Sequence, residues 1–77
     1  MANFLANAIS NDTVVAIVAT VNGNNCELLI TVFYCGYYLP KNRYTKKIDI
    51  NGKPIKDIIA DEIKNICDDP YEITYNF

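Results

Sequence analysis

The sequence predicts an α+β fold in one domain over residues 1–77, a small four-stranded, mostly antiparallel sheet with one main helix, at about residues 53–67, packed on one face. Three observations favour this fold. Two stretches rich in β-branched residues flank an NGNN turn, five isoleucines recur at helical spacing, and the last seven residues alternate between apolar and polar side chains. The expected order of elements is weak α, β, β, β, α, β.

The first expected element is a short helix over residues 3–9, NFLANAI. Phe4, Leu5, Ala8 and Ile9 would share one side of this helix at helical spacing. Because two turns do not hold a helix in isolation, the segment must pack against the rest of the fold or fray.

Two apolar strands are expected next. Residues 13–21, TVVAIVATV, suit a pleated surface because β-branched side chains are stiff, and NGNN at 22–25 supplies a hairpin turn. The second strand starts at Cys26 and could run to Leu39, with apolar side chains on both faces. Fully extended it would span ~45 Å, longer than a compact domain of ~30 Å, so we expect a bulge or kink at Gly36.

The second half of the chain is expected to add a strand, the main helix and a last strand. Residues 43–50, RYTKKIDI, predict a half-exposed strand near a sheet edge. Asn51 and Pro54 are typical of a helix start. The apolar stripe of that helix consists of Ile55, Ile58, Ile59, Ile63 and Ile66. Residues 71–77, YEITYNF, predict a strand that returns beside the sheet after a right-handed crossover.

Charge is laid out unevenly along the chain although the net charge is only −2. Residues 41–56 carry six lysines or arginines against Asp49, a balance of +5, and residues 57–77 carry six acids against Lys64, a balance of −5. This asymmetry can steer a partner, or it can simply be solvated surface charge.

The three cysteines do not predict a disulfide framework. Their number is odd, and Cys26 and Cys35 would lie ~30 Å apart on one extended strand, too far to bridge. We therefore expect buried, reduced thiols and a reducing compartment. No secretory signal or apolar run of membrane-spanning length is evident, so we expect the cytoplasm and no membrane contact. Ten Asn with abundant Ile, Lys and Tyr suggest an A/T-rich genome, that of a low-GC bacterium or its phage.

The sequence does not indicate an enzyme. It has no histidine, and its single serine, Ser10, has no evident base beside it. Asp57 and Asp61 lie four residues apart on the expected helix, where such pairs are usually solvated. No phosphate loop, zinc spacing or calcium loop is present, so we expect no cofactor and no metal.

One aromatic and basic patch is a candidate binding site. It consists of Tyr37, Tyr38, Arg43, Tyr44, Lys46 and Lys47. Tyrosine and arginine are frequent anchors of protein interfaces, and aromatic rings interleaved with cations also grip single-stranded nucleic acids. Core tyrosines beside ordinary surface lysines are the third reading of the same residues.

The expected sheet has more apolar surface than the chain can cover. One helix ~10 Å wide covers about two strands on one side, and the short N-terminal helix is too small to cover the other. We expect a second copy to close that face, with interface candidates Leu29, Phe33, Cys35 and Tyr37.

These expectations combine into a functional hypothesis. We expect a non-enzymatic protein-binding module, a small homodimer that occupies a surface of a larger protein. Phage inhibitors of host systems, anti-CRISPR proteins among them, offer an analogy of size and charge only. The setting would then be the cytoplasm of a bacterium or of a phage-infected host cell. The alternative is a single-stranded nucleic-acid binder that uses the Tyr/Lys/Arg hairpin 37–47.

Overall fold

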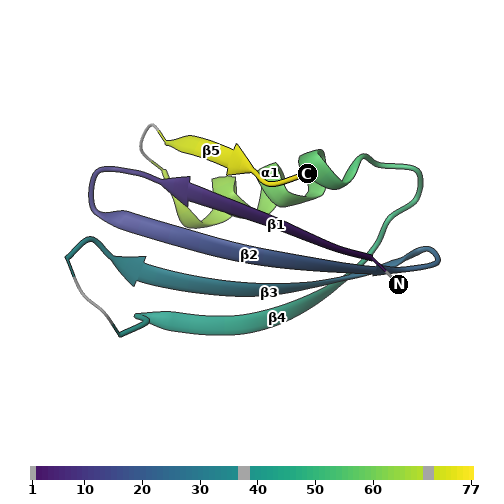
Figure 1. Ribbon diagram of the computed structural model, residues 1–77, viewed down its shortest axis with the longest axis horizontal. Helices are drawn as coiled ribbons and strands as arrows, with labels where there is room; N and C mark the ends of the chain where they lie inside the picture. Colours follow the sequence, from purple (N-terminus) through teal and green to yellow (C-terminus); the bar gives the residue numbers. More distant parts are fainter. Residues whose placement is uncertain (1, 37–38, 69–70) are drawn as a thin grey trace.

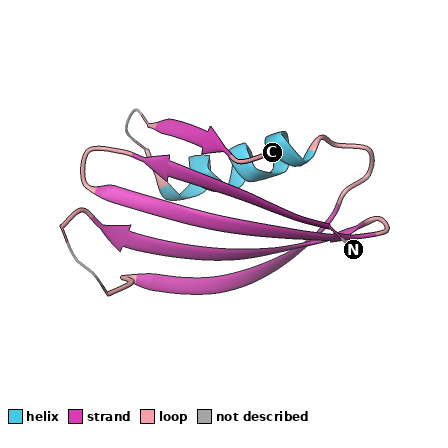
Figure 2. Cartoon of the chain, in the orientation of Figure 1, coloured by secondary structure: helices cyan, strands magenta, loops and turns pink. Residues whose placement is uncertain are grey.

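The computed structural model describes residues 2–36, 39–68 and 71–77 and confirms the α+β fold. Its elements are β1 (Ala2–Ile9), β2 (Thr13–Asn22), β3 (Asn25–Tyr34), β4 (Asn42–Asp49), α1 (Ile55–Ile66) and β5 (Glu72–Tyr75). The sheet has five strands rather than the expected four, in the order β4-β3-β2-β1-β5, with α1 on one face (Figures 1 and 2). All neighbouring strands pair antiparallel.

The predicted N-terminal helix over residues 3–9 is wrong, because this segment is strand β1. Its ladder with β2 runs from Ala2 opposite Val21 to Ile9 opposite Val14, and its other side pairs with β5. A two-turn helix would form few internal hydrogen bonds, whereas a strand between two neighbours pairs on both sides. The small side chains of Ala6 and Ala8 are buried toward α1.

Strand β3 is shorter than expected. It ends at Tyr34 instead of continuing to Leu39, so no bulge or kink is needed to fit the strand into the domain. Gly36 lies in a turn with a φ of 89°, a conformation that favours glycine. The β2–β3 hairpin closes at NGNN as expected, with Gly23 at a φ of 62°.

Helix α1 follows the expected isoleucine stripe closely. It begins after Pro54, and Ile58, Ile59 and Ile63 are fully buried against the sheet. The chain of antiparallel pairs means that β4 and β5 run in the same direction at opposite edges of the sheet. The connection through α1 therefore crosses the sheet over one face only (Figure 1).

The C-terminal strand completes the helix-covered side. Residues 72–75 form β5, and the amide of Asn76 still donates to the Leu5 carbonyl at 2.9 Å. The Phe77 ring packs edge-on against Phe4, with centroids 4.8 Å apart, and against Tyr75, at 5.7 Å. The core therefore lies between α1 and one face of the sheet.

Candidate interaction surface

The face of the sheet that points away from α1 is the main candidate site, and we call it the open face. The single helix in the described residues packs on the other side. Alternate positions of the strands form the open face: Asn3, Leu5, Asn7, Ile9, Val14, Ala16, Val18, Thr20, Glu27, Leu29, Thr31, Phe33, Arg43, Thr45, Lys47, Glu72 and Thr74. Leu5 is 50 % exposed, Ile9 58 % and Leu29 39 %, which is unusual for large aliphatic side chains in a domain with so small a core.

Strand register sorts the open face into rows that run across the strands. One apolar row consists of Ile9, Val14 and Phe33, and a second consists of Leu5, Val18 and Leu29. A more polar row lies between them: Thr74, Asn7, Ala16, Thr31 and Arg43. Two apolar stripes separated by a mostly polar one therefore cross the three central strands.

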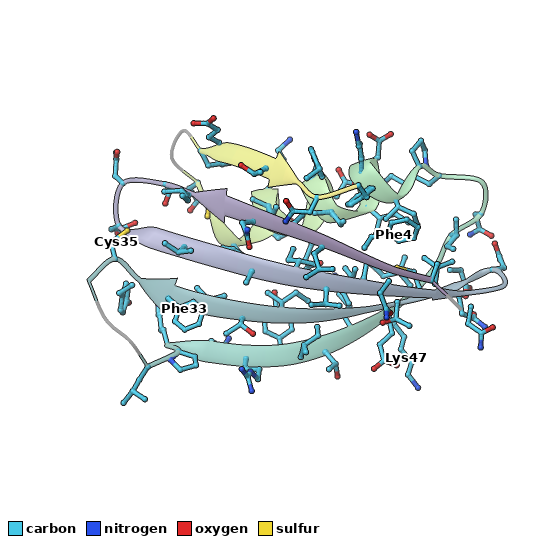
Figure 3. All side chains as sticks on the ribbon, in the orientation of Figure 1. Phe4, Phe33, Cys35 and Lys47 are labelled. Carbon is cyan, nitrogen blue, oxygen red and sulfur yellow. The ribbon has the colours of Figure 1, made fainter. Side chains whose placement is uncertain are left out.

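A polar end borders the second apolar row. Asn3, Thr20, Glu27 and Lys47 stand opposite one another there, and the Thr20 hydroxyl donates to Asn3 Oδ1 at 2.9 Å. A half-open hollow of about 450 Å³ lies at this end and is lined mainly by polar residues. Phe33 and Lys47 mark opposite ends of the open face (Figure 3). An apolar centre with a polar border is the usual anatomy of a protein interface.

The accessible surface is also larger than the mass predicts. The chain exposes 5090 Å², whereas a compact monomer of this mass exposes about 4,700 Å². Part of this excess surface comes from the elongated shape, because the molecule measures 37 Å along its longest axis and 22 and 20 Å along the other two. Part of the excess surface is the open face.

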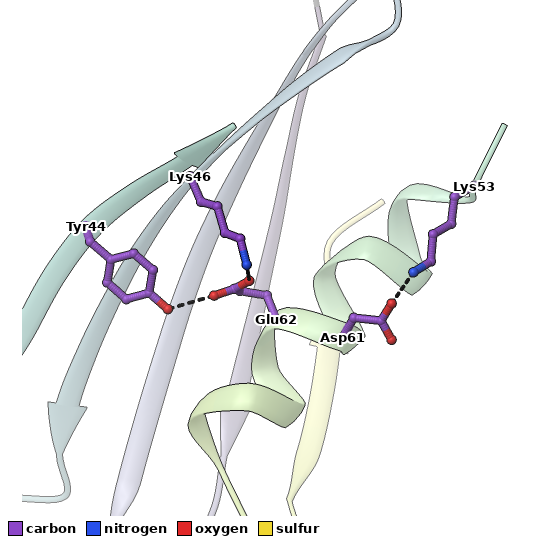
Figure 4. A network of polar contacts seen from close by, with 5 residues as sticks. All are labelled: Tyr44, Lys46, Lys53, Asp61 and Glu62. Carbon is purple, nitrogen blue, oxygen red and sulfur yellow. Dashed lines mark hydrogen bonds and ion pairs between the residues drawn. The ribbon is translucent and has the colours of Figure 1, made fainter. Parts of the chain in front are cut away.

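A buried polar network fastens α1 to β4 on the covered side (Figure 4). Glu62 is only 5 % exposed. Its Oε2 accepts a hydrogen bond from the Tyr44 hydroxyl at 2.8 Å, and its Oε1 pairs with the Lys46 ammonium at 3.0 Å. Both carboxylate oxygens are thus satisfied, as a buried charge requires. Burial, together with the hydrogen bond to Glu62 and its charge, raises the pKa of Tyr44 to about 12.

A second ion pair on α1 contrasts with this network. Lys53 pairs with Asp61, and both side chains are about half or more exposed (Figure 4). Exposed pairs of this kind contribute little to stability. The sequence did not predict the role of Glu62, although its place between Ile59 and Ile63 on the apolar stripe is a signal that its carboxylate points inward.

The described members of the predicted aromatic and basic patch divide between the two faces of β4. Arg43 and Lys47 lie on the open face, whereas Tyr44 and Lys46 point toward α1 and bind Glu62. Tyr37 and Tyr38, the remaining members, lie outside the described residues.

Three of the four predicted dimer-interface residues belong to the described part of the chain, and they lie on or near the open face. Leu29 and Phe33 stand in its two apolar rows, and Cys35 is exposed just beyond β3, so it is not the buried thiol that we expected. Tyr37, the fourth candidate, is outside the described residues. Cys26 and Cys67 are buried, and burial raises the pKa of the Cys26 thiol.

Sequence reasoning missed the β1 contribution to the open face. Leu5 and Ile9 belong to it, but both were assigned to a helix. The alternation of Leu5, Asn7 and Ile9 with Phe4, Ala6 and Ala8 is the signal that would have placed them there.

The end of the sheet beside the β3–β4 connection is a second exposed surface. Leu39 is 81 % exposed and Tyr34 is 42 % exposed. The Lys41 ammonium lies over the Tyr34 ring, 4.3 Å from its centroid, a cation–π contact. Apolar and basic groups therefore meet at this corner.

No protein-family model matches the chain, and neither curated proteins nor solved structures gave a significant match. Among the described residues, no helix has the length and apolar character needed to cross a membrane. The same residues contain no group of three or more cysteine or acidic side chains arranged to hold a metal ion.

Proposed function

We propose that the protein is a non-enzymatic protein-binding module, a small homodimer that acts by occupying a surface of a larger protein. The observation that supports this is the open face, where Leu5, Ile9 and Leu29 remain 39–58 % exposed within two aligned apolar rows. Contiguous apolar surface of this kind is typical of an interaction site. No cofactor or metal enters the proposal.

The one buried carboxylate among the described residues has a structural role. Glu62, the buried carboxylate, already has both oxygens engaged by Tyr44 and Lys46. The network holds α1 and β4 together, which is a structural role for this carboxylate.

The corner formed by Tyr34, Leu39 and Lys41 is the proposed contact with the larger protein. It combines an apolar side chain with an aromatic ring under a cation. Such groups are common anchors of protein interfaces. We place this activity in the cytoplasm of a bacterium or of a phage-infected host cell, where an inhibitor of a host system would act.

Light scattering at micromolar concentration tests the homodimer. We expect twice the chain mass of 8.7 kDa for the natural sequence and 8.7 kDa for Leu29→Asp, because a charge in an apolar row is costly to bury. Asn65→Asp adds the same charge on an exposed position of α1 and should leave the dimer unchanged. A natural protein that stays at 8.7 kDa would contradict the homodimer.

A salt titration separates the proposed partner from nucleic acid. We expect a fluorescent oligothymidine to bind weakly or not at all, since two cations of the predicted patch, Arg43 and Lys47, share the open face with acidic Glu27. Affinity that is tight at low salt and falls steeply with salt would favour the nucleic-acid binder instead. Capture of a protein from host extract by the natural chain, with loss in Leu39→Asp, would support the proposal.

A further inference from the structure

We infer that the second copy covers the open face sheet against sheet, with the two-fold axis lying between the sheets and parallel to β2. This arrangement rests on the proposed homodimer and specifies how it is built. β2 of one copy faces β2 of the other, β3 faces β1 of the partner, and β4 faces β5 of the partner. This order follows from rotating the sequence of strands β4-β3-β2-β1-β5 about its middle strand.

The available area is sufficient for such a dimer. Five strands that are spaced ~4.8 Å apart and average eight residues in length present a face of about 19 by 26 Å, or roughly 500 Å². Two such flat faces bury about 1,000 Å² in total, and side chains that project from them add to this area. A total of about 1,000 Å² is near the lower limit for a specific interface. A second copy is therefore large enough to close the open face, which α1 leaves exposed because it packs on the opposite face.

The rows of the open face match under this rotation. An axis parallel to the strands keeps each row at its own level, so apolar rows meet apolar rows. Leu29 then packs against the partner's Leu5 across a central pair of Val18 side chains, and Phe33 packs against the partner's Ile9. Sheets that pack face to face keep their strands within about 30° of each other. The apolar rows of the two copies therefore stay aligned near β2, at the centre of the interface.

The polar row between them is self-complementary as well. It brings Thr31 opposite the partner's Asn7, on either side of the small Ala16 at the centre. Thr31 is only 7 % exposed within one copy, so the contact mainly buries the exposed Asn7, whose amide can donate to or accept from the threonine hydroxyl. The small alanine lets the two middle strands approach closely.

Charge selects this axis over the other two-fold axis that would align the rows. An axis perpendicular to the strands would place Arg43 against its own copy at the edge of the dimer, with two cations in contact. The axis parallel to β2 places Arg43 opposite the partner's Thr74, one residue pair away from the partner's Glu72. Opposite charges meet twice in this dimer, and like charges directly opposite each other are avoided.

Cysteine cross-linking tests the axis directly. In a Cys35→Ser background, Arg43→Cys and Thr74→Cys proteins are mixed and treated with a short bismaleimide. We expect the mixture to give a covalent dimer and each protein alone to give little, because each engineered cysteine faces the other position. Efficient cross-linking of Arg43→Cys to itself would overturn the parallel axis. The background protein, whose remaining cysteines are buried, is the control.

A charge exchange provides the second test. Arg43→Glu and Glu72→Arg should each raise the dimer dissociation constant about fivefold, the effect of two weak exposed ion pairs, and the double variant should restore it. Failure of the double variant to restore affinity would overturn the arrangement. A natural protein that is already monomeric contradicts the homodimer itself. A dimer that Leu29→Asp disrupts, but whose Arg43→Cys links to itself, contradicts only the axis.

Discussion

The two faces of the sheet carry similar side chains in β2 and β3 but differ in what covers them. Leu28 and Leu29 are neighbours on one strand, yet Leu28 is fully buried under α1 and Leu29 is 39 % exposed on the open face. The difference arises because one crossover helix joins the two edges of the sheet and can lie on only one side. Local composition therefore does not decide which apolar side chain becomes core and which becomes interface.

The adjacent leucines allow the sharpest test of this comparison. Leu28→Ala should lower the free energy of unfolding by about 2–5 kcal/mol, because it leaves a cavity in the core. Leu29→Ala should cost less than about 1 kcal/mol in the monomer, since its side chain is already partly solvated. Urea unfolding at several protein concentrations measures both values. Equal losses at a concentration where only monomer is present would contradict the distinction between the faces.

The two ion pairs on α1 allow a second comparison, between a buried and an exposed carboxylate, with a smaller expected difference in stability. Glu62→Gln removes a buried charge that binds Tyr44 and Lys46, and we expect a loss of about 1–3 kcal/mol. Asp61→Asn, one residue away, removes the exposed partner of Lys53 and should cost less than about 1 kcal/mol. Denaturant unfolding of both variants checks the difference. A larger loss for Asp61→Asn than for Glu62→Gln would contradict this ranking of the buried and exposed ion pairs.

The pH dependence of stability should show a further effect of the same network. The pKa of Tyr44 is raised from 10.0 in the unfolded chain to about 12 in the fold, chiefly by burial and then by Glu62. A raised pKa means that the fold favours the protonated phenol. Its contribution is therefore fully present below pH 10 and is lost as pH rises toward 12.

Tyr44→Phe isolates that contribution. The thermal unfolding midpoint should fall less steeply with pH over this range for the variant than for the natural protein, because phenylalanine has no proton to lose. Asn65→Ala, at an exposed position of α1 that changes no titratable group, is the control and should follow the natural protein. Identical slopes for Tyr44→Phe and the natural protein would mean that the Tyr44 phenol does not contribute.

Much of the fold could be predicted because its signals are local. The β-branched run predicts β2, NGNN predicts the turn after it, and the isoleucine spacing predicts α1. Each of these patterns is complete within a short stretch of sequence. The N-terminal segment could not be assigned in the same way. Its seven residues fit both a helical and an alternating pattern, and only pairing with β2 and β5 favours the strand.

The candidate surface was predicted in part for the same reason. The sequence indicated that one sheet face would lack cover and named Leu29 and Phe33 on it, and both lie on the open face. It could not add Leu5 and Ile9, because their place depends on β1 joining the sheet. It also grouped Tyr44 and Lys46 with Arg43 as one patch, although alternation along β4 divides them.

The sequence alone therefore determined the kinds of element present and the surplus of apolar side chains on the strands, because both follow from spacing and composition within a short window. Only the tertiary structure decided that β1 completes the sheet, that α1 covers the side of Leu28, and that Glu62 holds Tyr44 and Lys46. These outcomes depend on contacts between segments far apart in the chain. The free energy of such contacts cannot be inferred from the residues of one segment alone.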